Sequence, residues 1–277
     1  MIAAARASAA PSLASRTGRD YLSYTQVTTY QRCPLKWQFE YLDKRSHERV
    51  GASLAFGSAV HAALETHFRA LLAGCSTPSP DELLVAFQQA WQAEVARPVQ
   101  YAQGETVQSL HELAGRLLAT FAASPHAIPD GEILGVEEEL RRQVIPGLPD
   151  VLARIDLIVR TDDALVLRDF KTARSRWSAA NQAESASQLL LYREVARPLA
   201  EEFGDLPIRL EFVVLTKTKR PAVDTHSVEF DPHALGRTQR VLARVWQAMQ
   251  AGHVYPNPSA MNCATCPFPQ ACRAWRG

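Results

Sequence analysis

The sequence predicts an α/β fold in which helices flank a central mixed β-sheet, and three patterns support this. Two apolar runs with alternating polarity, at about 151–160 and 164–171, are separated by the short polar stretch 161–163, as in a hairpin. A helical pattern at about 183–203 is inserted before the next strand candidate, at about 207–216. Further helical patterns precede the sheet, so helices and strands both contribute to one core.

The elements expected before the sheet are all helical. Ser23 can cap a short helix from about 24 to 32, and Cys33-Pro34 then ends it before a second amphipathic segment at about 34–41. Longer helices are expected at about 55–72, 81–96 and 105–123, separated by proline-containing loops. Strands are expected at about 132–144, 151–160, 164–171, 207–216 and 225–230, and a helix at about 232–250 leads into a tail rich in proline and cysteine.

Length and composition favour one elaborated domain over residues 21–277, because 277 residues with 47% hydrophobic composition can bury a full core. Within it we expect a helical subregion at about 53–125, a sheet-containing core at about 131–250 and a cysteine tail at 251–277 that joins Cys33. The first 20 residues are rich in alanine and serine and predict a disordered leader, although a transit peptide has a similar composition. No apolar run is long enough to span a bilayer.

The charge balance limits how the protein can bind nucleic acid. The formal net charge is +1 and the sequence pI is near 7.7, so any such binding must depend on local basic patches. The sequence has no nucleotide-binding loop of the G-x-x-x-x-G-K-[ST] type and therefore no recognisable motor of its own.

The hairpin places two carboxylates opposite each other. The residues from Val151 to Val159 at alternate positions form one apolar face, so Asp156 points the other way, and Asp169 and Lys171 share one side of the next strand. If Asp162 and Asp163 form a two-residue turn, the pairing of 161 with 164 sets Asp156 directly across from Asp169.

Two carboxylates at this spacing, roughly 4.5–5.5 Å, repel each other unless a cation compensates. Oxygen ligands suit Mg²⁺ or Mn²⁺, and Lys171 is placed to orient a water or to stabilise developing negative charge. This arrangement suits the hydrolysis of a phosphodiester. The alternative is a solvent-facing hairpin with ordinary surface charges.

Four of the five cysteines form a pattern that favours a metal. Cys263, Cys266 and Cys272 lie in a C-x2-C-x5-C arrangement, and Cys33 sits in a proline-flanked context that lets it supply a fourth ligand. Spacing alone does not choose between zinc and a [4Fe-4S] cluster, and disulfides are the further alternative. Cys75 follows a helix and is expected to be an ordinary thiol.

These motifs together resemble the RecB-type branch of the PD-(D/E)XK nucleases, and specifically its iron-sulfur members such as AddB-like and CRISPR-associated exonucleases. Residues 57–61, Gly-Ser-Ala-Val-His, resemble the G-x-x-x-H helix; residues 153–156 resemble the strand with the first acidic ligand. Residues 169–172 resemble the D-x-K core, and residues 188–192 resemble the Q-x-x-x-Y helix. The resemblance covers most of the chain and implies a sheet of the restriction-endonuclease-like type, with an N-terminal helical insertion and a tail held by a metal cluster.

The two helical motifs also have a physical interpretation. His61 and Glu65, at i and i+4, share a stripe beside an apolar one, so His61 can face a cleft while its helix stays anchored. Gln188 and Tyr192 share a helix face in the same way, where either can contact a nucleotide or simply pack.

The resemblance implies a metal-dependent deoxyribonuclease. His61, Asp156, Asp169 and the backbone carbonyl of Phe170 would hold Mg²⁺ or Mn²⁺, with Lys171 as the catalytic cation and Gln188 and Tyr192 beside it; Glu65 would be an outer carboxylate. Cys33, Cys263, Cys266 and Cys272 would hold the iron-sulfur cluster.

The DNA groove is expected to involve Arg174, Arg176, Trp177, Lys217, Lys219 and Arg220, which combine phosphate-binding and base-stacking side chains. We expect a cytoplasmic exonuclease that acts on single-stranded DNA ends in repair, recombination or end processing, with a separate helicase as a partner. The alternatives are a nuclease that trims DNA beside CRISPR adaptation proteins, and a non-catalytic subunit that binds DNA ends.

Overall fold

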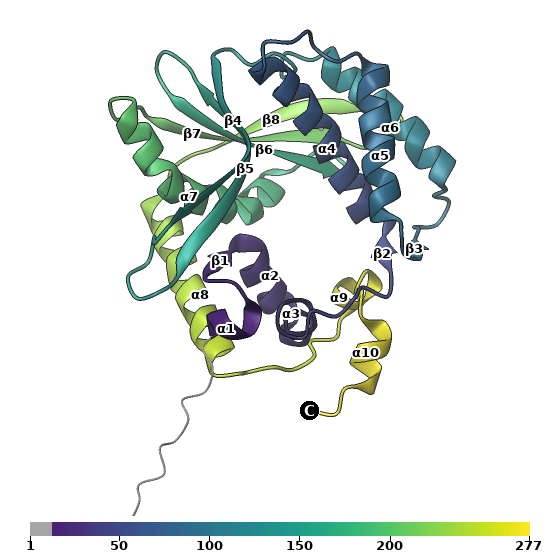
Figure 1. The fold of residues 1–277 in the computed structure, drawn as a ribbon, viewed down its shortest axis with the longest axis vertical. Coiled ribbons are helices and arrows are strands. Elements are labelled where there is room, and N and C mark those ends of the chain that lie inside the picture. The colour runs from purple at the N-terminus through teal and green to yellow at the C-terminus, as the bar shows by residue number, and fades with distance from the viewer. Residues whose placement is uncertain (1–12) are drawn as a thin grey trace, which may run out of the picture.

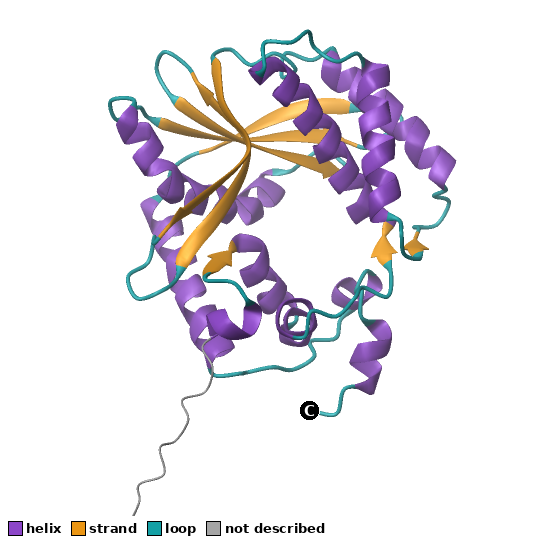
Figure 2. Ribbon diagram, in the orientation of Figure 1, coloured by secondary structure: helices purple, strands orange, loops and turns teal. Residues whose placement is uncertain are grey.

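A six-stranded mixed sheet lies at the centre of the computed structural model, which describes residues 13–277 (Figures 1 and 2). β5 (Asp150–Arg160) pairs along one edge with antiparallel β4 (Glu132–Arg142). Its other edge pairs with parallel β1 (Tyr21–Ser23) at residues 150–152 and with antiparallel β6 (Leu165–Ala173) at residues 157–160. β7 (Ile208–Thr216) runs parallel to β6, and β8 (Ala222–Val228) antiparallel to β7. This is the α/β architecture with a mixed sheet that the sequence predicts.

The hairpin of β5 and β6 has the predicted register. Leu157 pairs with Arg168, and the Thr161 N–H donates to the Ala164 carbonyl at 2.9 Å across the Asp162-Asp163 turn. The same register sets Asp156 opposite Asp169, one position beyond the last paired residues of the ladder. The two strands diverge from this point, which leaves both carboxylates at an opening in the sheet.

Three helices cover one face of the sheet: α4 (Ala52–Leu72), α5 (Pro80–Glu94) and α6 (Val107–Ala122). They form an apolar core with Val166 and Phe170 of β6 and Val213 of β7. Capping boxes at Ser79 and Thr106 begin α5 and α6. The predicted helical subregion therefore packs directly on the strand that carries Asp169.

The opposite face packs against α7 (Ala179–Glu202), α8 (Pro232–Gln250) and α2 (Tyr24–Arg32). The Ser23 side chain accepts a hydrogen bond from the Gln26 N–H and caps α2 as predicted. In Figure 1, α7 lies behind the sheet and α2 below it, beside the opening between β5 and β6.

The single apolar face predicted for residues 151–159 is wrong. Ile155 packs in the core with α7 and α8, whereas Leu157 packs in the core under α4. The change of side occurs at Asp156, which lies opposite Glu137 in the β4–β5 register. Glu137 has a φ of 52°, and a non-glycine residue in the left-handed region interrupts the regular pleat of a strand.

The N-terminal and C-terminal segments lie side by side. α1 (Leu13–Thr17) buries Leu13 in the core, so the predicted disordered leader is wrong for residues 13–20; residues 1–12 lie outside the described part. α3 (Pro34–Trp37) and a π-helical turn (Gln38–Leu42) follow α2, and the tail adds α9 (Ala260–Ala264) and α10 (Pro269–Ala274). β2 (Val50–Gly51), directly before α4, forms a two-stranded parallel sheet with β3 (Val99–Gln100), which lies between α5 and α6.

Across residues 13–277, no helix combines the length and the apolar character that crossing a membrane requires.

Candidate active site

α4 brings His61 against two carboxylates of the sheet. The Nδ1 atom of His61 lies 3.4 Å from Asp156 Oδ2 and 3.9 Å from Glu137 Oε1. One ligand atom from each of the three residues lies within 4.8 Å of the other two. Two carboxylate oxygens and an imidazole nitrogen are donors that Mg²⁺ or Mn²⁺ accepts, so these side chains fit a divalent cation.

A third carboxylate, that of Asp169, lies across the opening and is held by its own partners. Lys171 Nζ lies 2.5 Å from Asp169 Oδ2, and the Gln188 amide donates to Asp169 Oδ1 at 2.8 Å. Asp169 is 3% exposed, so this ion pair lies in the interior, where charge interactions are strong. The Phe170 N–H donates to Asp156 Oδ2 at 2.6 Å and ties the two strands together between the carboxylates.

α7 supplies a polar chain that orients Lys171. Gln188 accepts a hydrogen bond from Lys171 Nζ at 3.3 Å and donates to Tyr192 Oη at 3.2 Å. Because one amide contacts Asp169, Lys171 and Tyr192, the rotamer of each is restricted. The structure thus brings Asp156, Asp169, Lys171, His61, Gln188 and Tyr192 to one place.

The electrostatic environment is that of a buried acidic site. Burial, followed by the charge of Asp169, raises the pKa of Asp156 to about 7. Burial acts to lower the pKa of His61, but the contact with Glu137 and the charge of Asp156 outweigh it, and the pKa is raised. Burial likewise opposes the charge of Lys171, yet Asp169 raises its pKa, so the ammonium stays charged. A bound cation would relieve the repulsion among the carboxylates.

We expect Asp156 and His61 to make the metal-free protein progressively less stable, relative to an Asp156→Asn variant, as the pH rises from 5 to 8. The folded state keeps a proton on Asp156 up to a pKa of about 7, whereas the unfolded chain releases it near 3.8. His61 acts in the same direction, because the stabilisation from its raised pKa is lost as the pH rises through that value. Urea unfolding in the presence of a chelator measures the trend. Burial lowers the pKa values of His67, His111 and His126, which act in the opposite direction but equally in both proteins. The difference in stability between the wild type and Asp156→Asn is therefore the quantity to follow, and a difference that stays constant from pH 5 to 8 would contradict the assignment.

The sequence prediction missed Glu137. It lies in a run of three glutamates, 137–139, within a predicted strand, and alternation alone does not distinguish which one faces the site. The positive φ of Glu137 directs it toward His61. Glu65, which was expected to be an outer carboxylate, instead pairs with Arg69 at 2.7 Å on the surface of α4.

Glu137→Gln should weaken Mn²⁺ binding by at least about 10-fold, since loss of a supporting partner alone produces this effect at metal sites. Isothermal titration calorimetry measures the affinity. Glu132→Gln is the matched control, because Glu132 lies on the same strand and pairs with Arg160 on the surface. Equal affinities of the two variants would exclude Glu137 from the metal site.

The residues expected to bind DNA separate into two groups. Arg174 and Lys217 line cavities near the N-terminal end of α4. Arg176 lies 3.6 Å from Asp224, and the Trp177 ring packs 5.1 Å from that of Phe212. Lys219 and Arg220 are exposed in the turn between β7 and β8. Contacts of all six residues with DNA stay predictions.

A cavity of about 700 Å³ lies between α2, the segment 47–54, β3 and the C-terminal tail. Its walls carry four basic residues, Arg32, Lys36, Arg49 and Arg174, and two acidic ones, Glu40 and Glu105. Threonines of α2 line another side. A cavity with an excess of positive charge and hydroxyl groups suits a phosphate backbone.

The tail closes this cavity on the side away from the sheet. The Glu48 N–H donates to the Pro267 carbonyl at 2.9 Å, and the Arg49 guanidinium donates to the Cys266 carbonyl at 2.9 Å. The Leu35 N–H donates to the Tyr255 carbonyl at 3.1 Å, and the Asn262 amide donates to the Arg32 carbonyl at 2.9 Å. The sheet, α4, β2, the tail, α3 and α2 thus form a closed ring of contacts, which can be followed in Figure 1.

The cysteines lie at this closure. Cys33, Cys266 and Cys272 pack around the buried Phe268, whereas Cys263 and Cys75 are exposed, and all five are free thiols. Among residues 13–277 no three cysteine sulfurs lie within 4.8 Å of one another. The structure therefore brings the two cysteine-bearing segments together without forming a site for a single ion.

Comparison with known proteins identifies the family. A model of the PD-(D/E)XK nuclease superfamily matches residues 21–273. The chain belongs to this superfamily. The resemblance drawn from the motifs is thus confirmed at the superfamily level. PD-(D/E)XK nucleases use divalent metals, in agreement with the acidic site between α4 and β5.

One solved structure supports the same fold. A crystal structure from Eubacterium rectale, titled as that of a candidate exonuclease, shares 13% identity with this PD-(D/E)XK nuclease at a TM-score of 0.55. The matched region covers 93% of this chain and 89% of the chain in the crystal structure. The crystal structure of SSO0001 shares 14% identity with this chain at a TM-score of 0.35. The matched region covers 90% of this chain and 96% of the SSO0001 chain. No curated protein matches the sequence.

Proposed function

We propose that this chain is a metal-dependent exonuclease of the RecB type that hydrolyses single-stranded DNA from its ends. The observation that carries the proposal is the position of the acidic site beside a basic cavity closed by the tail. α4 contributes to both, since Ser53 lines the cavity and His61 contacts Asp156. α2 contributes as well. Thr25 lines the cavity, and the preceding Tyr24 is close enough to Lys171 for that charge to act on the pKa of the Tyr24 hydroxyl.

His61, Glu137, Asp156 and Asp169, with the Phe170 carbonyl, would hold one or two Mg²⁺ or Mn²⁺ ions. When bound, such ions supply electrostatic stabilisation of the scissile phosphate and make a water more acidic. Lys171 keeps its proton beside Asp169 and contributes a fixed positive charge toward the reacting phosphate. Gln188 holds Lys171 in this direction, so the charge needs no rearrangement during the reaction.

The closed ring accounts for a preference for ends. A cavity of about 700 Å³ has the volume of a site for one or two nucleotides, which suits a single strand. A circular strand has no end to insert and would have to enter by opening the tail contacts.

A disulfide across the ring tests this proposal. A Cβ at Gly51 would lie 3.8 Å from the Cβ of Thr265, which is within the range for a disulfide. The Gly51→Cys/Thr265→Cys variant is made in a Cys75→Ser background and closed without oxygen by added oxidised glutathione, which takes up the two electrons and two protons of the thiols. The closed variant should still digest linear single strands with Mg²⁺ or Mn²⁺. Circular strands should be spared by the wild type and by the closed variant alike.

The reduced form of the same variant is the matched control. Cleavage of circles by the wild type would indicate an endonuclease. Loss of linear digestion on closing the disulfide, restored by reduction, would show that DNA enters through an opened ring and would contradict entry by ends.

We also propose that Cys33, Cys263, Cys266 and Cys272 hold a [4Fe-4S] cluster. Tetrahedral zinc with bonds of about 2.3 Å needs its sulfurs within roughly 4 Å of one another. Among the described residues no three cysteine sulfurs lie within 4.8 Å of one another, and this favours a cluster, which bonds each cysteine to a different iron. The surrounding Leu35, Phe39 and Phe268 provide an apolar shell.

A further inference from the structure

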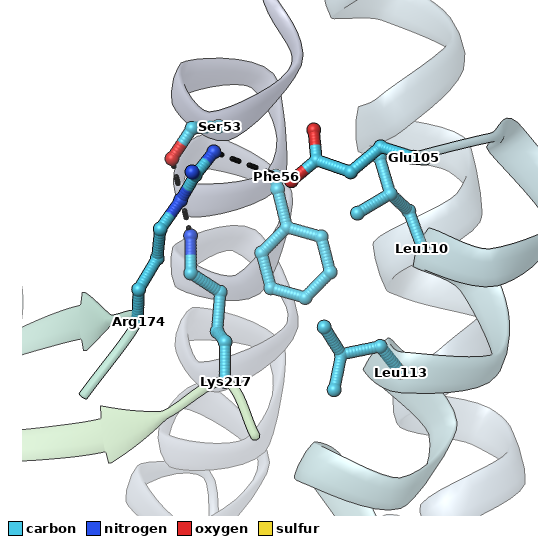
Figure 3. Close-up of a pocket in the computed structure, with 7 residues that line it drawn as sticks. All are labelled: Ser53, Phe56, Glu105, Leu110, Leu113, Arg174 and Lys217. Atoms are coloured by element: carbon cyan, nitrogen blue, oxygen red, sulfur yellow. Dashed lines mark hydrogen bonds and ion pairs between the residues drawn. The ribbon is translucent and has the colours of Figure 1, made fainter. Parts of the chain in front are cut away.

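A smaller cavity of about 210 Å³ opens beside the large one at the N-terminal end of α4 (Figure 3). Ser53, Glu105 and Arg174 line both cavities, so the two adjoin. Figure 3 shows Lys217 and Arg174 extending from the ends of neighbouring strands toward Ser53, while Leu113 lies deeper, below the Phe56 ring. A group that enters from the large cavity meets the polar atoms first and an apolar wall behind them.

The charges in this pocket are unbalanced. Arg174 pairs with Glu105 at 3.3 Å, but Lys217 has no carboxylate within 4.0 Å among residues 13–277. Lys217 Nζ instead donates to Ser53 Oγ at 3.2 Å and lies 5.0 Å from the centroid of the buried Phe56 ring. A half-buried ammonium whose partners are a hydroxyl and an aromatic ring has no opposite charge beside it, so its burial is costly without an anion.

The electrostatics support an anionic ligand. Burial, and then the charge of Arg174, lower the pKa of Lys217. An anion between the two cations would reverse this effect, and Ser53 can donate a further hydrogen bond to it. The backbone fixes both cations, because the Lys217 N–H donates to the Ala173 carbonyl at 2.6 Å, next to Arg174.

The pocket lies at a defined distance from the acidic site. Ser53 and His61 are eight residues apart on one face of α4, which corresponds to about 12 Å along the helix. In a stacked single strand, successive phosphates are roughly 3.4 Å apart along the axis. The distance of about 12 Å between Ser53 and His61 therefore corresponds to about three or four phosphodiester linkages, and to fewer in an extended strand.

We propose that Lys217, Arg174 and Ser53 form a phosphate subsite that fixes the position of the substrate strand relative to the scissile bond. This inference rests on the proposed nuclease function and extends it. The ligand is a nucleic-acid phosphate, either an internal phosphodiester or a terminal phosphomonoester. Occupation of the subsite would set how far the strand advances past the acidic site before each cleavage.

The test is binding of fluorescent single strands by the full chain in a chelator, where cleavage does not occur. Each strand carries one neutral methylphosphonate at a different linkage, or lacks its terminal phosphate. Lys217→Met, which keeps the apolar stem over Phe56, should bind the unmodified strand about 10-fold more weakly, as expected for loss of one charge-assisted contact. The slope of log affinity against log salt should become shallower by about 0.7. Lys44→Met removes an exposed lysine outside both cavities and is the control.

The outcome depends on the map of affinities, that is, the affinity measured for each strand as a function of the linkage that carries the methylphosphonate. The wild type should lose affinity at one linkage, and Lys217→Met should be insensitive at that same linkage. If removal of the terminal phosphate weakens binding by the wild type but not by Lys217→Met, the ligand of the subsite is the phosphate at the strand end. Identical maps for the wild type and Lys217→Met would overturn the subsite while leaving the nuclease proposal intact. No binding of any strand by the wild type would refute both.

Discussion

Lys171→Met is expected to lower the rate of DNA cleavage by on the order of 10²–10³-fold while leaving the divalent cation bound, as for loss of one preorganised charge at a reacting centre. Lys171 contacts Asp169 and Gln188 but is not one of the cation's ligands. The substitution removes the positive charge of the Lys171 ammonium from the acidic site, so the affinity for Mn²⁺ should stay the same or increase. Asp156→Asn should lose both activity and metal binding.

The two readouts separate catalysis from folding. Single-turnover digestion of end-labelled strands gives the rate, and calorimetry with Mn²⁺ gives the affinity. Because Lys171→Met leaves Asp169 buried with only Gln188, the variant must also be compared for stability. Arg168→Met is the matched control: Arg168 is on the same strand and pairs with Glu211 at 2.7 Å, outside the acidic site. Full activity of Lys171→Met would remove Lys171 from the mechanism.

Cys266→Ser is expected to abolish the brown visible absorption of anaerobically purified protein and to release the C-terminal tail. The proposed cluster joins Cys33 to cysteines some 230 residues away, and closing a loop of this length stabilises a chain by on the order of 5 kcal/mol in the chain-entropy model. The thermal midpoint should therefore decrease. Hydrogen exchange should increase first at residues 255–274 and at Glu48 and Arg49, which bond to the tail.

Cys75→Ser controls for the loss of a thiol, because Cys75 is exposed and lies in the loop after α4. It should keep the absorption, the iron content and the thermal midpoint. A wild-type protein that is colourless and contains zinc would contradict the iron-sulfur proposal, and it would require the cysteine sulfurs to approach one another more closely than in this structure.

Features that depend on neighbouring residues in the chain could be predicted from the sequence. The bounds of α2 and α8 follow from Ser23 and from Pro232 at the first turn of its helix, since caps and proline act within one turn. The register that sets Asp156 opposite Asp169 follows from a two-residue turn, because such a turn leaves one way to pair the flanking strands. Period-two alternation then places Lys171 beside Asp169.

Features that depend on how distant segments pack could not be predicted in this way. Alternation assigns the residues of β5 to one apolar face, but the irregularity at Glu137 divides them between two cores. β1 is three residues long and is defined only by its pairing with β5.

The sequence by itself therefore determined the α/β elements, the hairpin and the residues Asp156, Asp169 and Lys171, because local hydrogen bonding and side-chain periodicity specify them. Only the tertiary structure decided that Glu137 joins His61, that the tail closes the cavity, and that Lys217 meets Arg174. These contacts join residues far apart in the chain, and their geometry depends on the packing of α4 and the tail against the sheet, which no local pattern encodes.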